Sequence, residues 1–303
     1  MNYTELLESI YSQISLHKND GKIASYIPEL AQVNPDQFGI AIRDINGETG
    51  QFGDAEVRFS IQSISKVIAL VLAVHKAGDK VWERVRVESS GNAFNSLVQL
   101  EYENGIPRNP LINSGAIVIC DILLSHCDSA LDEMLELIRV LSGNTTIHIN
   151  PDVVKSELDT GYRNFALAYF LKSMNNLNND VESVLQLYCS LCAIEMSCVE
   201  LAHCFHFFAT HNIKNETGKL ISKSQIKRIS AIMLSCGFYD ESGEFLFKVG
   251  LPRKSGVGGG IVAIHPRHFS VAAWSPRLNA KGNSVMAMKA LELLTTELDT
   301  SLF

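Results

Sequence analysis

The stretch RFSIQSISKV, residues 58–67, places Ser63 three residues before Lys66. The apolar run VIALVLAV follows at once and leads to Gly78, which predicts a helix that is apolar on nearly every face and therefore buried. The same Ser-x-x-Lys spacing occurs at two other places, but neither opens an apolar helix: Ser15 with Lys18, and Ser224 with Lys227. The buried helix predicted after Ser63 distinguishes this serine from Ser15 and Ser224.

Two interpretations of Ser63 and Lys66 are open at this level. Positions three apart share one face of a helix, so the amine of Lys66 can reach the hydroxyl of Ser63. Burial lowers the pKa of a lysine, and the free N–H groups of a helix N-terminus stabilise an oxyanion. The pair is then a nucleophile with its base. The alternative is that Ser63 caps the helix and Lys66 lies on the surface.

Lys254-Ser255-Gly256, in GLPRKSGVGGGIVAI (residues 250–264), favours the catalytic interpretation. It is the only Lys-[Ser/Thr]-Gly in the chain and directly precedes a β-type segment. A Lys-Ser-Gly strand that faces a Ser-x-x-Lys helix is the arrangement of serine β-lactamases and penicillin-binding proteins. The two motifs together indicate an acyl-transfer enzyme.

Strand-like segments lie at both ends of the chain. QFGIAIRDINGETGQFGD (37–54) predicts two strands joined by a turn at Asn46-Gly47. GEFLFKVGLP (243–252), GGGIVAIHP (258–266) and HFSVAAWSP (268–276) predict three more, and Pro266-Arg267 predicts a hairpin between the last two. Between them, 131–143, 164–174 and 183–210 have helical spacing.

The predicted fold class is therefore α/β of the α+β type, with a mainly antiparallel sheet built from both chain ends and flanked by helices. We expect one catalytic domain over 1–303. It would comprise an α/β lobe, approximately 1–70 plus 236–303, and an inserted helical lobe, approximately 71–235.

Composition narrows the partners and the compartment. The net charge of −7 disfavours nucleic acid and anionic membranes. Seven cysteines, an odd number, favour reduced thiols and a cytoplasmic location, and the N-terminal residues predict an amphipathic helix rather than a signal peptide. The Cys and His residues between Cys189 and His206 lie along helical texture, so we expect buried thiols and no metal site.

Several motifs, taken together, resemble those of the bacterial glutaminases. They are QSISK (62–66), NPLINSGAI (109–117), Glu157 with Asn164, CGFYDESGEF (236–245) and GLPRKSGVGGGI (250–261). The matches are collinear from Tyr26 to about residue 284. The resemblance implies a β-lactamase/transpeptidase-like fold, hydrolysis of L-glutamine to L-glutamate and ammonia, no cofactor, and a homo-oligomer such as a tetramer.

The resemblance also implies roles for individual residues. Ser63 would be the nucleophile, Lys66 its base, and Tyr239 a participant in proton transfer. The backbone N–H groups of Ser63 and Val257 would form the oxyanion hole. Ser63, Tyr239 and Val257 would also contact the substrate, together with five further binding residues: Tyr26, Asn113, Glu157, Asn164 and Tyr188. Two alternatives are a β-lactamase or penicillin-binding-like hydrolase, and a non-catalytic amino-acid-binding member of the fold.

Overall fold

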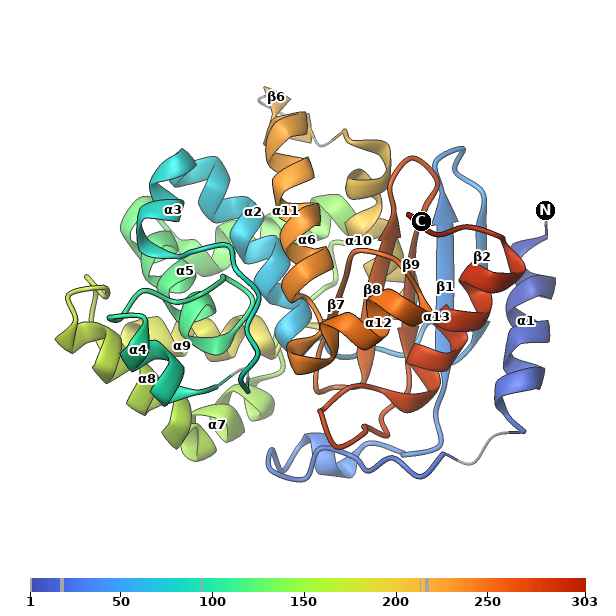
Figure 1. Ribbon diagram of the computed structural model, residues 1–303, viewed down its shortest axis with the longest axis horizontal. Coiled ribbons are helices and arrows are strands. Elements are labelled where there is room, and N and C mark those ends of the chain that lie inside the picture. The colour runs from blue at the N-terminus through green and yellow to red at the C-terminus, as the bar shows by residue number, and fades with distance from the viewer. Residues whose placement is uncertain (1, 17–18, 94, 213, 216–217) are drawn as a thin grey trace.

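A five-stranded antiparallel sheet lies in one half of the molecule, on the right in Figure 1. The structure is a computed structural model that describes residues 2–16, 19–93, 95–212, 214–215 and 218–303. The strand order is β2-β1-β9-β8-β7. The bounds are β1 Gly39–Asp44, β2 Thr49–Gly53, β7 Arg253–Ser255, β8 Gly260–His265 and β9 Phe269–Trp274. Because β1 pairs with β9, the two chain ends share one sheet, as predicted.

Two tight hairpins of this sheet were predicted from local sequence and are confirmed. The β1–β2 turn contains Gly47 at φ 90°, a conformation that glycine adopts without steric cost. In the β8–β9 turn Arg267 takes φ 68°. Successive side chains of a strand point to opposite faces of the sheet, so Ile40 and Ile42 lie on one face of β1 and Ala41 lies on the other.

Helices cover both faces of the sheet. On one face α1 (Tyr3–Ile14) and α13 (Val285–Glu297) bury apolar residues such as Ile10 and Leu291. On the other face α10 (Cys198–Thr210) packs against β1, β8 and β9 and buries Phe205 and Phe208. The sheet is therefore the middle layer of a mixed α/β core, which confirms the predicted fold class.

Most remaining helices gather on the far side of α2 from the sheet (Figure 1). α2 (Ser65–Ala77) is buried from Ser65 through Val74, as its uninterrupted apolar run predicted, and packs on α5. The other bounds are α3 Val81–Arg84, α4 Leu97–Tyr102, α5 Asn113–His126, α6 Ala130–Ser142, α7 Pro151–Thr160, α8 Tyr162–Ser173, α9 Val181–Cys192 and α11 Lys223–Cys236. Two short strand pairs complete this part: β3 Phe59–Ser60 with β4 Glu195–Met196, and β5 Lys214–Asn215 with β6 Gly218–Lys219.

The strand predicted over 243–252 is wrong. This segment forms α12 (Ser242–Lys248), and the sheet strand β7 begins only at Arg253. Phe245 is fully buried against Phe238, with ring centroids 4.6 Å apart, whereas Phe247 is 90% exposed. A short alternating apolar run does not distinguish strand from helix, and here the packing of Phe245 decides.

Within the described residues, no single helix is long and apolar enough to cross a membrane. The helices α5 and α6 meet the length and composition requirement only as a pair bent by 103°. Most of α5 is buried inside the protein, from Asn113 through Leu123.

Candidate active site

Ser63 lies in a single 3₁₀ turn, η2 (Gln62–Ile64), that leads directly into α2. Gln62 has φ 50°, a left-handed conformation that costs energy for a non-glycine residue and is typical of functional sites. The loop after β7 presses on this turn, since a Cβ at Gly256 would lie 2.5 Å from the carbonyl oxygen of Ile61 and 3.3 Å from the Ser63 nitrogen. Only glycine fits there, so the Lys-Ser-Gly segment and the Ser63 turn are in direct contact.

Lys66 is buried beneath Ser63 and is 3% exposed. Its Nζ donates to Asn113 Oδ1 at 2.6 Å, and Asn113 Nδ2 donates to Asn164 Oδ1 at 2.9 Å. This chain of polar groups joins α2, α5 and α8. The other two Ser-x-x-Lys pairs differ: Ser224 and Lys227 are exposed on α11, and Lys18 lies outside the described residues.

Burial lowers the pKa of Lys66 to about 8, because an ammonium loses its hydration inside the protein. The thiol of Cys192 and the carboxyl group of Glu157 oppose this shift to a smaller extent. A neutral amine is therefore accessible near physiological pH. The sequence interpretation that Lys66 is a surface residue beside a helix cap is wrong.

Tyr239 lines the same cavity as Ser63. It begins the 3₁₀ turn η4 (Tyr239–Glu241), with φ 52°, and its phenol donates to the carbonyl oxygen of Ser255 at 3.5 Å. The side chain of Ser63 lowers the pKa of this phenol and so opposes the effect of burial. Burial raises the pKa of Tyr239 to about 12, so it is a neutral hydrogen-bond donor at neutral pH. Lys254 Nζ lies 4.5 Å from the centroid of its ring and donates to the carbonyl oxygen of Ser255 at 2.5 Å.

Glu157 provides a carboxylate on α7. The side chain of Asn150 caps this helix by accepting hydrogen bonds from Asp152 N and Val153 N, and Pro151 occupies the first turn. Burial raises the pKa of Glu157, while a hydrogen bond from Gln62 and the charge of Lys66 lower it. An ammonium group bound next to this carboxylate would favour its ionised form.

These groups surround one cavity of about 250 Å³. It is lined by Tyr26, Ser63, Asn113, Glu157, Asn164, Tyr188, Tyr239 and Val257, all of which the sequence nominated. Lys66 lies behind the wall, with its Nζ 5.7 Å from the ring centroid of Tyr188. Tyr26 is 58% exposed at the rim.

The cavity also contains residues that sequence reasoning missed: Ile27, Gln62, Asn95, Thr160, Gly161 and Arg163. Gln62 belongs to the QSISK motif, and three others lie between Glu157 and Asn164, so their neighbours in sequence were a usable signal. Ile27 likewise follows Tyr26. Asn95 had no such signal, because the segment around it carries no motif.

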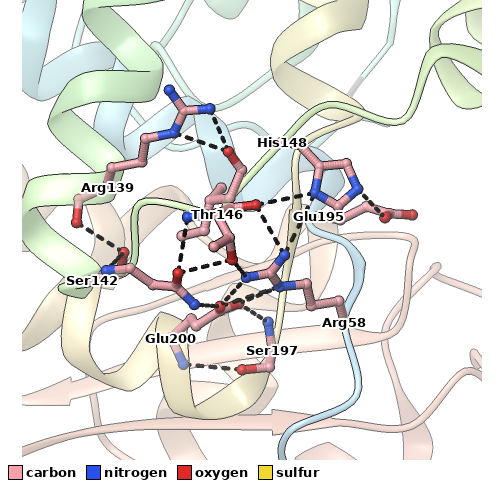
Figure 2. A network of polar contacts seen from close by, with 10 residues as sticks. Arg58, Arg139, Ser142, Thr146, His148, Glu195, Ser197 and Glu200 are labelled. Atoms are coloured by element: carbon pink, nitrogen blue, oxygen red, sulfur yellow. Dashed lines mark hydrogen bonds and ion pairs between the residues drawn. The ribbon is translucent and has the colours of Figure 1, made fainter.

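A polar network joins Arg58 to Glu200 and Thr146 (Figure 2). Arg58, just before β3, donates to Glu200 Oε1 of α10 at 2.6 Å and to Thr146 Oγ1 at 2.7 Å. Glu195, which pairs with Ser60 across β3 and β4, accepts from Asn150 Nδ2 at 2.9 Å. The strand before Ser63 and the cap of α7 are thus connected through side chains.

All seven cysteines are free. Among the described residues, no group of three or more His, Cys, Asp and Glu side chains could hold a metal ion.

The antiparallel sheet, the helical region between its strands, and the contact of the Ser63 turn with the Lys-Ser-Gly segment define a protein of the β-lactamase-like fold. The family model described as Glutaminase matches residues 21–303. The chain belongs to the glutaminase family and is an amidohydrolase.

Individual relatives agree with this assignment. A glutaminase of Saccharophagus degradans is 51% identical over 100% of this chain and 99% of its own length, and one of Agrobacterium fabrum is 50% identical over 98% and 97%. The solved structure of the probable glutaminase ybaS has a TM-score of 0.92 at 32% identity, covering 99% of this chain and 97% of its own. A Bacillus glutaminase crystallised in 4.3 M NaCl has a TM-score of 0.87 at 33% identity and covers both chains fully.

Proposed function

We propose that this chain hydrolyses L-glutamine to L-glutamate and ammonia through an acyl-enzyme on Ser63. The observation that carries the proposal is one cavity lined by both Ser63 and Tyr239, with Lys66 buried one helical turn after Ser63, where burial lowers its pKa to about 8. A base with a pKa near the working pH, close to a weak nucleophile, is what serine acyl transfer requires.

The cavity suits the amino-acid end of glutamine. Glu157 would pair with the α-ammonium, and the amide N–H groups of Asn164 and Asn113 would donate to the α-carboxylate. Tyr188 and Tyr26 would line the rest of the pocket. A buried site that satisfies both charged ends rejects analogues that lack either one, because its own polar groups would be left unpaired.

In the first half-reaction Ser63 Oγ attacks the side-chain carboxamide carbon and Lys66 accepts its proton. The N–H groups of Ser63 and Val257 stabilise the oxyanion. The C–N bond then breaks, and Tyr239 passes a proton to the departing ammonia and recovers one from Lys66. In the second half-reaction water attacks the ester, with the same groups acting in reverse, which releases glutamate and restores Ser63.

The decisive experiment compares ammonia release from glutamine by wild type and Ser63→Ala, with a chromogenic β-lactam assayed in parallel. We expect wild-type release of ammonia, its loss in Ser63→Ala, and no β-lactam turnover. Activity that survives in Ser63→Ala would refute the nucleophile. Turnover of the β-lactam without glutamine hydrolysis would favour the β-lactamase alternative, and binding of glutamine without turnover the non-catalytic one.

We further propose that residues 1–303 act as one catalytic domain without a cofactor, in a reducing cytoplasmic compartment and as a homo-oligomer such as a tetramer. Seven free cysteines support the compartment. Exposed aromatic side chains, such as Phe247 at 90% and Tyr102 at 84%, support an assembly that covers some of them. Light scattering under reducing conditions tests the assembly, and a monomer would refute it.

A further inference from the structure

A second cavity, of about 650 Å³, lies beside the first. The two share only Tyr26 and Val257. The walls of the second cavity come from two segments, residues 20–26 and 278–285, which the N–H groups of Lys22 and Leu278 tie together by donating to each other's carbonyl oxygens at 2.8 Å. Ammonia, the leaving group from glutamine, needs no cavity of this size.

The second cavity adjoins the amide end of the proposed glutamine site. Gly282 lines it, and a Cβ at Gly282 would lie 3.6 Å from Val257 Cγ1 and 4.0 Å from Tyr239 Cε2. Asn279 Nδ2 donates to Glu241 Oε1 at 2.9 Å and so fixes this wall to the turn that carries Tyr239. Glu157 and Asn164 line only the first cavity. A substituent on the leaving nitrogen, next to Tyr239, would therefore extend into the second cavity.

The lining of the second cavity offers cationic and polar groups. Lys281 forms an ion pair with Asp240, whereas Lys22 has no ion-pair partner among the residues that the structure describes. Lys22 is exposed on this lining, and the acidic Asp20 lines the same cavity, so a ligand carboxylate would pair with the ammonium of Lys22 and be repelled by Asp20. A leaving group whose nitrogen lies next to Tyr239 and whose carboxylate pairs with Lys22 is an amino acid.

We propose that the second cavity binds the amino-acid portion of γ-glutamyl amino acids, with Lys22 pairing with its free carboxylate, and that the chain hydrolyses these compounds as well as glutamine. This inference rests on the proposed Ser63 chemistry. Ser63 Oγ forms the ester with the γ-carbon while the C–N bond breaks, and the amino acid leaves with the proton that ammonia would otherwise take. Water then cleaves the ester, so one water is consumed and one glutamate and one amino acid are released.

The test measures glutamate release from glutamine, γ-glutamylmethylamide and γ-glutamylglycine by the full chain. We expect wild type to cleave all three. In Lys22→Glu, kcat/KM for γ-glutamylglycine should fall about fivefold, the factor expected from a partly exposed ion pair, while the other two substrates change less than about twofold. Ala280→Trp, which narrows only the second cavity, should slow γ-glutamylglycine and leave glutamine hydrolysis intact.

Lys80→Glu is the matched control, because it makes the same charge change at an exposed lysine outside both cavities. Hydrolysis of glutamine without any release from γ-glutamylglycine overturns this inference and leaves the proposed function standing. Release from none of the three substrates overturns both. If Lys22→Glu slows γ-glutamylglycine no more than Lys80→Glu does, the cavity does not select a carboxylate and the inference is overturned.

Discussion

Replacing Asn113 by Asp tests whether Lys66 is the base, because it adds a charge next to Lys66 with little change in shape. It also removes an N–H donor to the substrate α-carboxylate, so the midpoint of the pH profile, and not the absolute rate, carries the test. Asn113 Oδ1 accepts from Lys66 Nζ at 2.6 Å. With a pKa of about 8, Lys66 is about one-tenth neutral at pH 7. A base must be neutral to accept a proton, so kcat/KM in wild type should rise with pH through about 8.

A carboxylate at position 113 stabilises the ammonium form of Lys66 and moves this rise to higher pH. At about 4 Å and an effective dielectric constant of about 20, a unit charge contributes about 4 kcal/mol, or about 3 pH units. The cost of burying the new carboxylate cancels part of this gain. We therefore expect the midpoint to rise by at least about one unit, with about a tenfold loss of rate at pH 7 for each unit.

The assay is ammonia release from glutamine, with kcat/KM measured between about pH 6 and 10. Asn164→Asp is the matched control, because its carboxylate would lie one side chain further from Lys66, beyond the 2.9 Å Asn113–Asn164 hydrogen bond. The midpoint of the rise of kcat/KM with pH should move less in Asn164→Asp than in Asn113→Asp. A midpoint that stays near 8 in a correctly folded Asn113→Asp variant would refute Lys66 as the titrating base.

Three further changes test other parts of the site. Tyr239→Phe should lower kcat about a hundredfold and leave KM within about twofold, since it removes the phenol proton while the ring still lines the cavity; an unchanged kcat would exclude the proton-transfer role of Tyr239. Lys66→Met should stabilise the protein by about 3 kcal/mol at pH 7, measured by urea unfolding. The pKa of Lys66 is about 8 in the folded protein and 10.5 ordinarily, so the gain in stability is complete below pH 8 and vanishes above pH 10.5. A gain that does not depend on pH would show that it does not come from burial of the Lys66 ammonium. Arg58→Met should lower the free energy of unfolding by about 2 kcal/mol, because it leaves the largely buried carboxylate of Glu200 without its cationic partner. Lys155→Met, at the exposed ion pair with Asp159, should lower it by less than about 0.5 kcal/mol. Equal losses in the two variants would argue against a stabilising role of the Arg58–Glu200 network.

Local sequence was sufficient for much of the sheet and for the central helix. The turn at Asn46-Gly47, the hairpin at Pro266-Arg267 and the apolar run of α2 are patterns within contiguous residues, and all three elements formed where expected. Residues 243–252 were predicted incorrectly because alternating apolar residues over so short a run fit a helix as well as a strand.

The candidate site divides in the same way. The motifs nominated eight side chains of the cavity wall and the buried Lys66, since each motif is a short segment with its own chemistry. The sequence therefore determined which groups are present and predicted the helices that carry Lys66 and Tyr188, but not α5 and α7, which carry Asn113 and Glu157. Only the tertiary structure decided that Lys66 donates to Asn113, 47 residues away, that Asn95 joins the wall, and that a second cavity opens beside Tyr239. These contacts join segments distant in the chain, and their distances and burial follow from packing and not from local pattern.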